Sequence, residues 1–496
     1  MSSSEARGTP IAGLLAVTAA AVCVQGYHLG ADDAAIYVPG IKKVADPALY
    51  SFGAEFIQSH ARLTLFPNLV GGTARLTRLP ADWAIFAWHI AGVFLLLLAG
   101  WKLVCACFAN APARWGGVAL LAALLGVPVA GTALAIADPY VTSRTLSTPA
   151  GLLAVAAFLA GRRKQAAGWW LLTAVIHPQM SVYVAVFLGC AEAARRWSHS
   201  EAKLPAAHLA YYSVLPFLFP FEPARGPARE ALYSRTYFFA SQWAWYEWVG
   251  AIAPLVLLWW FGAGNFRGTK PAFRAAARSL VPFGLLSMAA FLMLAIPERL
   301  ENYARLQPMR AFQLIYVLFF LLLGGLIGEY VLERRAWRWA ALFLVLAVSL
   351  SAVQLSAYPA SAHLEWPLAR PANPWIQAFL WIRHNSPKDA VFALDPQYMA
   401  RPGEDMHGFR AVAERSMLAD AVKDSGVVSL FPQLAGDWKS QVEARTGWRH
   451  FKLSDFQRLS RQYPVTWVVA EQPAAGLVCP YRNRVVAVCR IPDAGR

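Results

Sequence analysis

The sequence predicts a polytopic α-helical membrane protein with about 11 transmembrane helices, followed by a small C-terminal α/β domain. Of its 496 residues, 57% are hydrophobic and only 15% are charged. The mean hydropathy is +0.39, which is too apolar for a soluble protein of this length. Apolar segments recur from Pro10 to Ser356, and the chain becomes polar after that. We therefore expect a transmembrane domain in residues 1–356 and a soluble domain in residues 357–496.

Windows of roughly 20 apolar residues, shortened where Pro or His interrupts them, give the expected spans. These lie at residues 10–28, 83–108, 115–137, 147–161, 166–177, 179–194, 204–221, 249–263, 280–297, 311–331 and 337–356. The fifth and sixth are too short for ordinary spans. They predict one helix that is broken or re-entrant at the sequence "HPQ", a shape that is tolerated at membrane depth only where protein or a wet cavity surrounds the freed backbone.

The orientation follows from the loops that carry basic residues. On one side of this eleven-span topology lie Arg162, Arg163, Lys164, Arg195, Arg196, Arg267, Lys270, Arg274, Arg278, Arg334, Arg335 and Arg338. The positive-inside rule makes that side cytoplasmic. The N-terminus is then cytoplasmic, whereas the first loop (residues 29–82) and the C-terminal domain are external. Lys42, Lys43, Arg62, Arg75 and Arg78 remain in that external loop. They suggest an anionic ligand, although a loop of this length also escapes the rule.

The net charge of +16 does not indicate nucleic-acid binding, because the basic residues lie in short clusters between apolar segments. Membrane lipids are the expected surroundings. No sequence pattern specifies an oligomeric state.

The polar tail has the local signals of a small α/β domain. Asn373 is a predicted N-cap with Pro374 at the first helical position. The runs "AVFALD", "VTWVVAE" and "RVVAVCRI" resemble strands. Ser454, with Gln457 three residues later, predicts a capping box that opens another helix. Cys479 and Cys489 flank "PYRN" and form either a hairpin disulfide or two free thiols.

Two groups of carboxylates are candidate site residues. Asp32 and Asp33 follow the first span in "GADDAAIYVPG", and Asp138 follows the third, with Arg144 nearby. One acid of the pair could simply cap the helix "AAIYV", and Asp138 could simply begin a turn. Alternatively, a carboxylate in a partly dehydrated mouth acts as a general base or holds a divalent cation. Their common external side favours the functional interpretation.

Three further positions carry polar groups that are candidates for function. His177 precedes a Pro within an apolar stretch and is either a buried, hydrogen-bonded histidine or a functional one. Arg310 opens a late span and is either a snorkelling anchor or a ligand of a lipid phosphate. The sequence "EDMH" (residues 404–407) lacks metal-ligand spacing and is interpreted as a solvated loop. P-loop, G-x-S-x-G and H-E-x-x-H motifs are absent, which leaves ATP-driven and zinc-protease chemistry without support.

This layout resembles the GT-C superfamily of membrane glycosyltransferases. The likeness is carried by "DDAAIYVPGIKKVADPALY", "TSRTLSTPAGLLAVAAFLAGRR" and "HPQM", and it is closest to uncharacterised bacterial members. The resemblance implies a multi-pass protein of the bacterial inner membrane. It maps the acid of the first external loop to Asp33 or Asp32 and the second acid to Asp138. It maps the basic residue that holds a donor phosphate to Arg310 or Arg144. The pair "DD" differs from the Asp-Glu pair and the D-x-D of several characterised members.

The resulting hypothesis is transfer of a sugar from a polyprenyl-phosphate-linked donor to a periplasmic acceptor. Asp33 takes the acceptor proton, Asp138 assists the acceptor or a cation, and Arg310 and Arg144 offset the phosphate charge. Two alternatives belong to other classes: a transporter or flippase for a lipid-linked anion, and a non-catalytic membrane scaffold. Since no internal repeat is visible and the polar groups gather at one face, the enzyme is favoured over the transporter.

Overall fold

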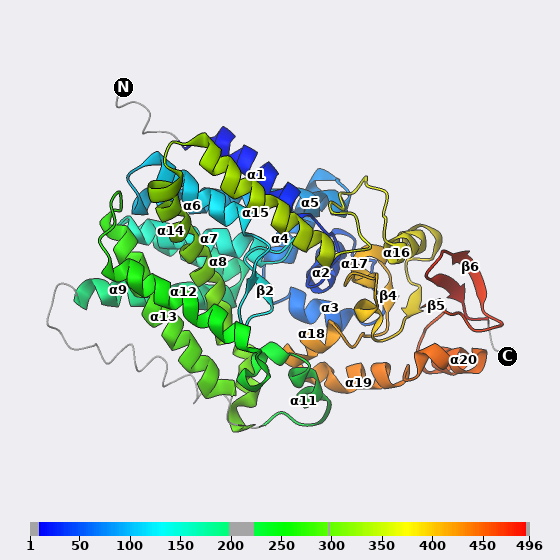
Figure 1. Ribbon diagram of the computed structural model, residues 1–496. Helices are drawn as coiled ribbons and strands as arrows, with labels where there is room; N and C mark the ends of the chain where they lie inside the picture. The colour runs from blue at the N-terminus through cyan, green and yellow to red at the C-terminus, as the bar shows by residue number, and fades with distance from the viewer. Residues whose placement is uncertain (1–8, 198–222, 296–297, 493–496) are drawn as a thin grey trace.

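The computed structural model describes residues 9–197, 223–295 and 298–492 and is mostly helical (Figure 1). Within these residues, five helical segments are long and apolar enough to cross a membrane. They are α5 (Ala81–Cys107), α12 (Trp245–Ala263), α13 (Pro271–Ala295), the stretch Glu298–Leu332 around α14 (Phe312–Ile327), and α15 (Ala336–Ala357). Two shorter apolar helices are α1 (Ile11–Gln25) and α7 (Arg144–Leu159).

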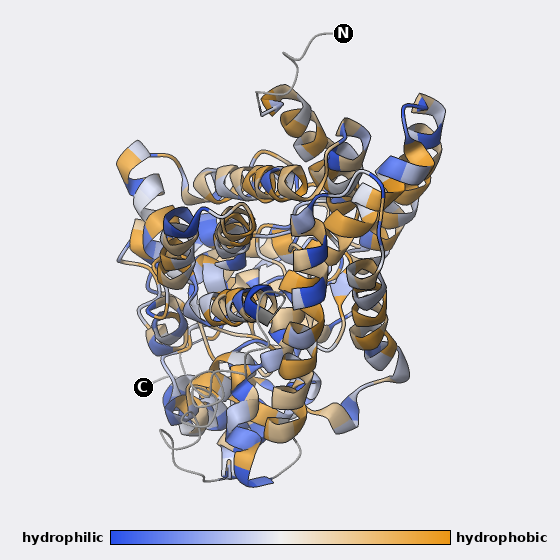
Figure 2. Ribbon diagram, turned by 90° about the vertical axis from the view of Figure 1, so that its left-hand side faces the viewer, coloured by the Kyte–Doolittle hydropathy of each residue, from blue (hydrophilic) through white to orange (hydrophobic). Residues whose placement is uncertain are grey.

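The surface of these helices is that of a protein embedded in a membrane. Hydrophobic residues predominate along the long helices in Figure 2. Only 6% of the most apolar stretch of α15 is buried, and Leu344, Val345 and Val348 are all more than half exposed. A contiguous apolar face of this kind is unfavourable in water and favourable in lipid. These helices are consistent with a membrane-embedded protein, and five of them in the described residues, against the eleven spans expected, are long and apolar enough to cross a membrane.

The third expected span, residues 115–137, is wrong as a helix. Helix α6 (Ala111–Ala123) ends early, and a hairpin of β1 (Pro128–Val129) and β2 (Leu134–Ala135) follows it. Pro128 cannot donate to a helical ladder, and Gly131 adopts a positive φ of 68° in the turn. The hydrophobicity of the segment concealed this break. The seventh expected span, residues 204–221, lies outside the described residues.

The predicted break at "HPQ" is confirmed. Helix α8 (Arg163–Ile176) ends before His177, and α9 (Pro178–Trp197) begins after it. His177 is extended, with φ −154° and ψ 92°, because the following proline disfavours the helical region.

The first loop folds into three helices: α2 (Ala34–Ala45), α3 (Ala54–Ala61) and α4 (Phe66–Thr77). Figure 1 shows α2 and α3 between the long helices and the C-terminal sheet. Val38 and Val70 share one hydrophobic core with Ile85 of α5 and Ala411 of the tail. The first loop is therefore the packing layer that joins the two domains expected from the sequence.

The C-terminal part contains a five-stranded mixed sheet in the order β4-β3-β5-β7-β6. Strand β3 pairs in parallel with β4 and β5, whereas β7 is antiparallel to β5 and β6. The strands are β3 (Val391–Ala393), β4 (Ser416–Met417), β5 (Trp467–Ala470), β6 (Val478–Arg482) and β7 (Ala487–Arg490). The remaining described α-helices are α11 (Gly226–Tyr233), α16 (Pro374–Asn385), α17 (Phe409–Ala413), α18 (Asp424–Leu430), α19 (Ala435–Glu443) and α20 (Leu453–Gln462).

In this part the predicted Asn373 cap is confirmed, the disulfide alternative for the two cysteines is correct, and the predicted Ser454 cap is wrong. The Asn373 side chain accepts from the Trp375 N–H at 2.8 Å and caps α16 as predicted. Cys479 and Cys489 form a disulfide across β6 and β7. Ser454, in contrast, lies inside α20, because the helix begins at Leu453 and the backbone N–H of the preceding residue donates to Asp455 at 2.9 Å.

Candidate functional site

The segment that carries Asp32 and Asp33 is held by backbone hydrogen bonds to the C-terminal part. The Asp32 N–H donates to the Met406 carbonyl at 2.8 Å, and the Gly408 N–H donates to the Gly30 carbonyl at 2.9 Å. Asp32 adopts φ 50°, a left-handed conformation that Asp tolerates better than most residues. The backbone therefore fixes where both carboxylates point.

Neither carboxylate caps the helix through its side chain. Asp33 occupies the N-cap position of α2, but its side chain makes no cap hydrogen bond. Both carboxylates instead contact the ammonium of Lys423, which lies at the start of α18; the contact with Asp33 measures 3.1 Å. The capping alternative is wrong for the side chains, because a buried cation competes with the helix amides for them.

Arg144 joins Asp33 to Asp138. Its guanidinium lies 3.4 Å from an Asp33 oxygen and 2.7 Å from an Asp138 oxygen. Only 3% of the Arg144 side chain is exposed, so both contacts are largely shielded from water. Thr142 also donates to Asp138, at 3.1 Å. We refer to Asp32, Asp33, Asp138, Arg144 and Lys423 as the Asp33 cluster.

Asp33 and Asp138, the two acids that contact Arg144, have opposite electrostatic environments. Burial disfavours the charge of Asp33, but Lys423 and Arg144 outweigh burial and hold its pKa well below the usual range. Burial raises the pKa of Asp138 and is only partly offset by Arg144. Asp33 is therefore a weak base while both cations remain in place. Asp33 can act as a general base only if Lys423 or Arg144 moves away from its carboxylate.

Arg310 and His177 lie near the same cluster. Arg310 is in the short 3₁₀ segment η5 (Pro308–Ala311), close enough for its charge to act on Asp33. Its Nε is buried and has no hydrogen-bond partner among the described residues. His177 is 7% exposed, and its Nδ1 is likewise unpartnered there. The charges of Arg144 and Arg310 both reach His177. The structure thus brings together all six residues that the sequence singled out.

Three neighbours were missed by the sequence analysis. Lys423 is 391 positions from Asp32 in the sequence and is not part of any recognisable motif. Tyr37 accepts a hydrogen bond from Ser143 at 3.3 Å, and its ring contacts His60 at a centroid distance of 4.7 Å. Burial lowers the pKa of His60 to about 4, so this imidazole is neutral at physiological pH. Nothing in the local sequence distinguishes these residues from ordinary surface or core residues.

The space around the cluster is small. A cavity of about 20 Å³ borders Asp138 and Arg144, which is room for a single water molecule. A larger cavity of about 420 Å³ lies elsewhere, between α2, α4 and α16, and is lined by Lys42, Arg75, Arg78 and Arg383. Lys42 contacts Asp82 at 2.6 Å and Glu414 at 2.8 Å. Part of this positive charge is therefore neutralised.

The "EDMH" segment is not a solvated loop. Glu404 and His407 are both 0% exposed, because the segment packs against residues 27–32 and its Glu404 carbonyl accepts from Asn373 at 3.1 Å. His407 belongs to the one group of three or more metal-ligand side chains found among the described residues, with His28 and Glu365. Asp32 and Asp33 are not part of it, so the carboxylate pair is not where a divalent cation fits best.

The comparisons with known proteins add no relative. No protein-family model matches the chain, and no curated protein matches it at a significant level.

Proposed function

We propose that this protein is a membrane glycosyltransferase that transfers a sugar from a polyprenyl-phosphate-linked donor to an acceptor at the periplasmic face of the bacterial inner membrane. The single observation behind the proposal is the Asp33 cluster. It combines a candidate base, a second acid and two cations at one end of apolar helices, with a third cation, Arg310, close by. Acid–base chemistry on a phosphate-linked donor needs these groups.

The ion pairs suggest how the site is activated. A donor phosphate competes with Asp33 for Arg144, Lys423 and Arg310, since phosphate binds guanidinium and ammonium groups strongly. Withdrawal of these cations raises the proton affinity of Asp33. Asp33 then accepts the proton of the acceptor hydroxyl. The hydroxyl oxygen forms the bond to the anomeric carbon, and the bond to the phosphate oxygen breaks. Polyprenyl phosphate leaves with that electron pair, stabilised by the same cations.

The test compares cell-envelope glycans and transfer by the purified full-length protein. Asp33→Asn is expected to lower the transfer rate at least about 100-fold, the usual contribution of a general base. Glu55→Gln is the matched control, because Glu55 lies exposed in α3 of the same loop and is expected to leave transfer unchanged. If deleting the gene alters the glycans while Asp33→Asn does not, the assignment of the base is wrong.

A scaffold function is the second candidate, and it is favoured by the same ion pairs. In the described conformation the acids are neutralised and the adjoining cavity is only about 20 Å³. A scaffold predicts that acid-to-amide variants keep function, whereas removal of the residues after Tyr358 abolishes it. The transporter alternative predicts flux of a labelled lipid across liposomes without covalent change.

A further inference from the structure

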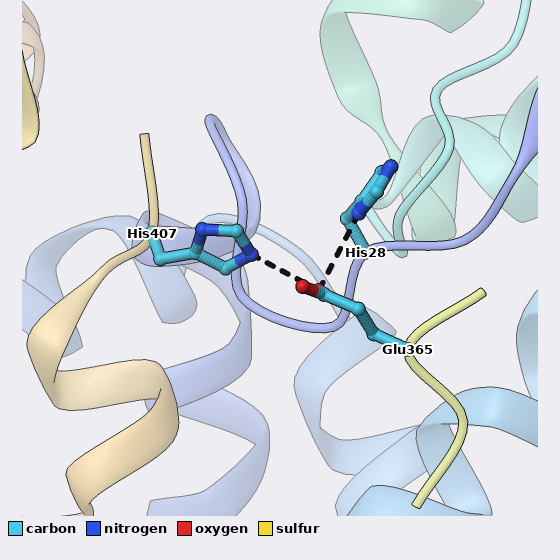
Figure 3. Close-up of side chains that lie close together, drawn as sticks. All are labelled: His28, Glu365 and His407. Atoms are coloured by element: carbon cyan, nitrogen blue, oxygen red, sulfur yellow. Dashed lines mark hydrogen bonds and ion pairs between the residues drawn. The ribbon is translucent and has the colours of Figure 1, made fainter. Parts of the chain in front are cut away.

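Three segments that are far apart in the sequence bring two histidines and a glutamate together. His28 follows α1, Glu365 lies in the segment after α15, and His407 precedes α17. Figure 3 shows the Glu365 carboxylate between the two imidazole rings. We refer to these three residues as the histidine cluster.

The distances within the histidine cluster suit a small metal ion. His407 Nε2 is 3.0 Å and His28 Nδ1 is 3.4 Å from the same Glu365 oxygen. One ligand atom from each residue lies within 4.8 Å of the others. Tetrahedral zinc with bonds of about 2.0–2.1 Å places its ligand atoms about 3.3 Å apart. Two of the three separations are thus close to those of a bound ion, and the third does not exceed 4.8 Å.

Polar atoms in the histidine cluster are unsatisfied. His28 is 0% exposed, yet neither of its ring nitrogens has a hydrogen-bond partner among the described residues. The second oxygen of Glu365, Oε1, is equally unpartnered there. Leaving a buried polar group unpaired is destabilising. A ligand that accepts a lone pair from one His28 nitrogen and one from Glu365 would remove part of this cost.

The surroundings hold the rings in ligand-competent orientations. His407 Nδ1 lies 3.0 Å from the Glu404 carbonyl, which leaves Nε2 directed at Glu365. Metal-bound histidines usually donate their other nitrogen to a carbonyl in this way. The His28 ring stacks on Tyr358 with centroids 3.8 Å apart, which fixes its plane.

An ion pair without metal explains only part of this arrangement. A protonated His407 could pair with Glu365 at 3.0 Å. The His28 contact of 3.4 Å is long for a hydrogen bond, however, and His28 Nε2 has no hydrogen-bond partner among the described residues. A metal ion would take one nitrogen from each histidine and one oxygen from Glu365, and so explains why these three side chains face one another.

We propose that His28, Glu365 and His407 form a binding site for a divalent transition metal ion of the zinc class, with a fourth position open to water or another ligand. Two imidazoles and one carboxylate suit zinc, whereas calcium and magnesium prefer oxygen ligands alone. The site is independent of the proposed glycosyl transfer. It would clamp the C-terminal part onto the segment before α2, where Ala31 already forms a backbone bridge with His407.

The test measures metal content directly. The full chain is purified in detergent through an affinity tag without histidines and without chelators, and metals are quantified by mass spectrometry. We expect about one zinc-class ion per chain. His28→Gln and Glu365→Gln should each reduce the content at least tenfold, whereas His450→Gln, which removes an exposed imidazole, should not.

A titration of the apo wild type with Co²⁺ covers the case in which a variant fails to fold. Visible absorption that saturates at one equivalent and disappears on addition of Zn²⁺ supports the site. Absence of stoichiometric metal from the wild type together with no saturable Co²⁺ spectrum overturns it, as does unchanged metal content in a folded His28→Gln variant. Neither readout depends on transferase activity, so failure of the metal site and failure of the proposed function are distinguishable.

Discussion

The Asp33 cluster and the histidine cluster adjoin the same short segment, residues 28–33. They differ in how far their buried polar atoms are paired with other side chains. In the Asp33 cluster, Lys423 and Arg144 pair with the carboxylates. In the histidine cluster, the nitrogens of His28 and one oxygen of Glu365 lack hydrogen-bond partners among the described residues, and the only ion-pair contact of His28 is the 3.4 Å one to Glu365. Most charges of the Asp33 cluster are therefore already paired, while the Arg144 Nε has no hydrogen-bond partner among the described residues. Unpaired buried groups indicate a site that awaits a ligand.

The largest effect should come from removing the cation between the two acids. Arg144→Met leaves Asp138 buried without its guanidinium, and loss of one partner of a buried pair costs about 3–5 kcal/mol. Denaturant unfolding in detergent would measure the change. Adding Asp138→Asn to this variant should restore part of the stability, since the unpaired charge is then gone. A double variant no more stable than Arg144→Met would contradict this explanation.

Metal removal should affect only the histidine cluster. If the ion is present at 100 times its dissociation constant, a strong chelator should lower the free energy of unfolding by about 2.7 kcal/mol. His28→Gln should be insensitive to the chelator, whereas Arg144→Met should retain the full response. Thermal unfolding with and without chelator measures both. Equal responses in wild type and His28→Gln would show that the chelator acts elsewhere.

Lowering the pH should destabilise the folded protein, because protonation of Asp33 removes its ion pairs in the Asp33 cluster. The pKa of this carboxyl is lower in the folded protein than its unfolded value of about 3.9. Its contribution is therefore present above the unfolded pKa and is lost as the pH falls through that value toward the folded one. Between about pH 5 and 3 the wild type should lose more stability than Asp33→Asn.

Asp138 provides the opposite control for the pH experiment. Its folded pKa is raised by burial, so its contribution is greatest below the unfolded pKa and is lost as the pH rises through the folded value. Unfolding of the wild type, Asp33→Asn and Asp138→Asn as a function of pH measures these differences. Parallel curves for wild type and Asp33→Asn would contradict the depressed pKa of Asp33.

The smallest effect is expected at an exposed pair that joins the same two parts of the molecule. Lys388 contacts Asp46 at 2.8 Å, but the two side chains are 63% and 39% exposed. Lys388→Ala should cost less than about 1 kcal/mol, because water and salt screen such pairs. A loss as large as that of Arg144→Met would mean that burial is not what distinguishes the Asp33 cluster. Denaturant unfolding under the same conditions gives the comparison.

Much of the fold could be predicted because its signals are local. The apolar runs of α5 and α15, the break at His177 and the cap at Asn373 all depend on residues a few positions apart. The hairpin after α6 was missed, since its residues are as apolar as those of a span. The burial of Glu404 and His407 was missed because "EDMH" is polar, and its packing partners lie in other segments.

The candidate site was predictable only as a set of residue types. Asp33, Asp138, Arg144 and Arg310 stood out because charges are rare beside apolar helices. Their partners were not predictable. Lys423 is an ordinary lysine in a polar tail, and nothing near it in the sequence indicates a carboxylate 391 residues away.

The sequence by itself determined that this is a helical membrane protein with a polar C-terminal part, because hydrophobicity and helix periodicity are properties of short segments. Only the tertiary structure decided that the first loop is the layer between these parts, that Asp33 pairs with Lys423 and Arg144, and that His28 meets Glu365 and His407. The physical reason is that ion pairs and ligand sets depend on distances in space. Those distances are set by the packing of segments that are remote in the chain.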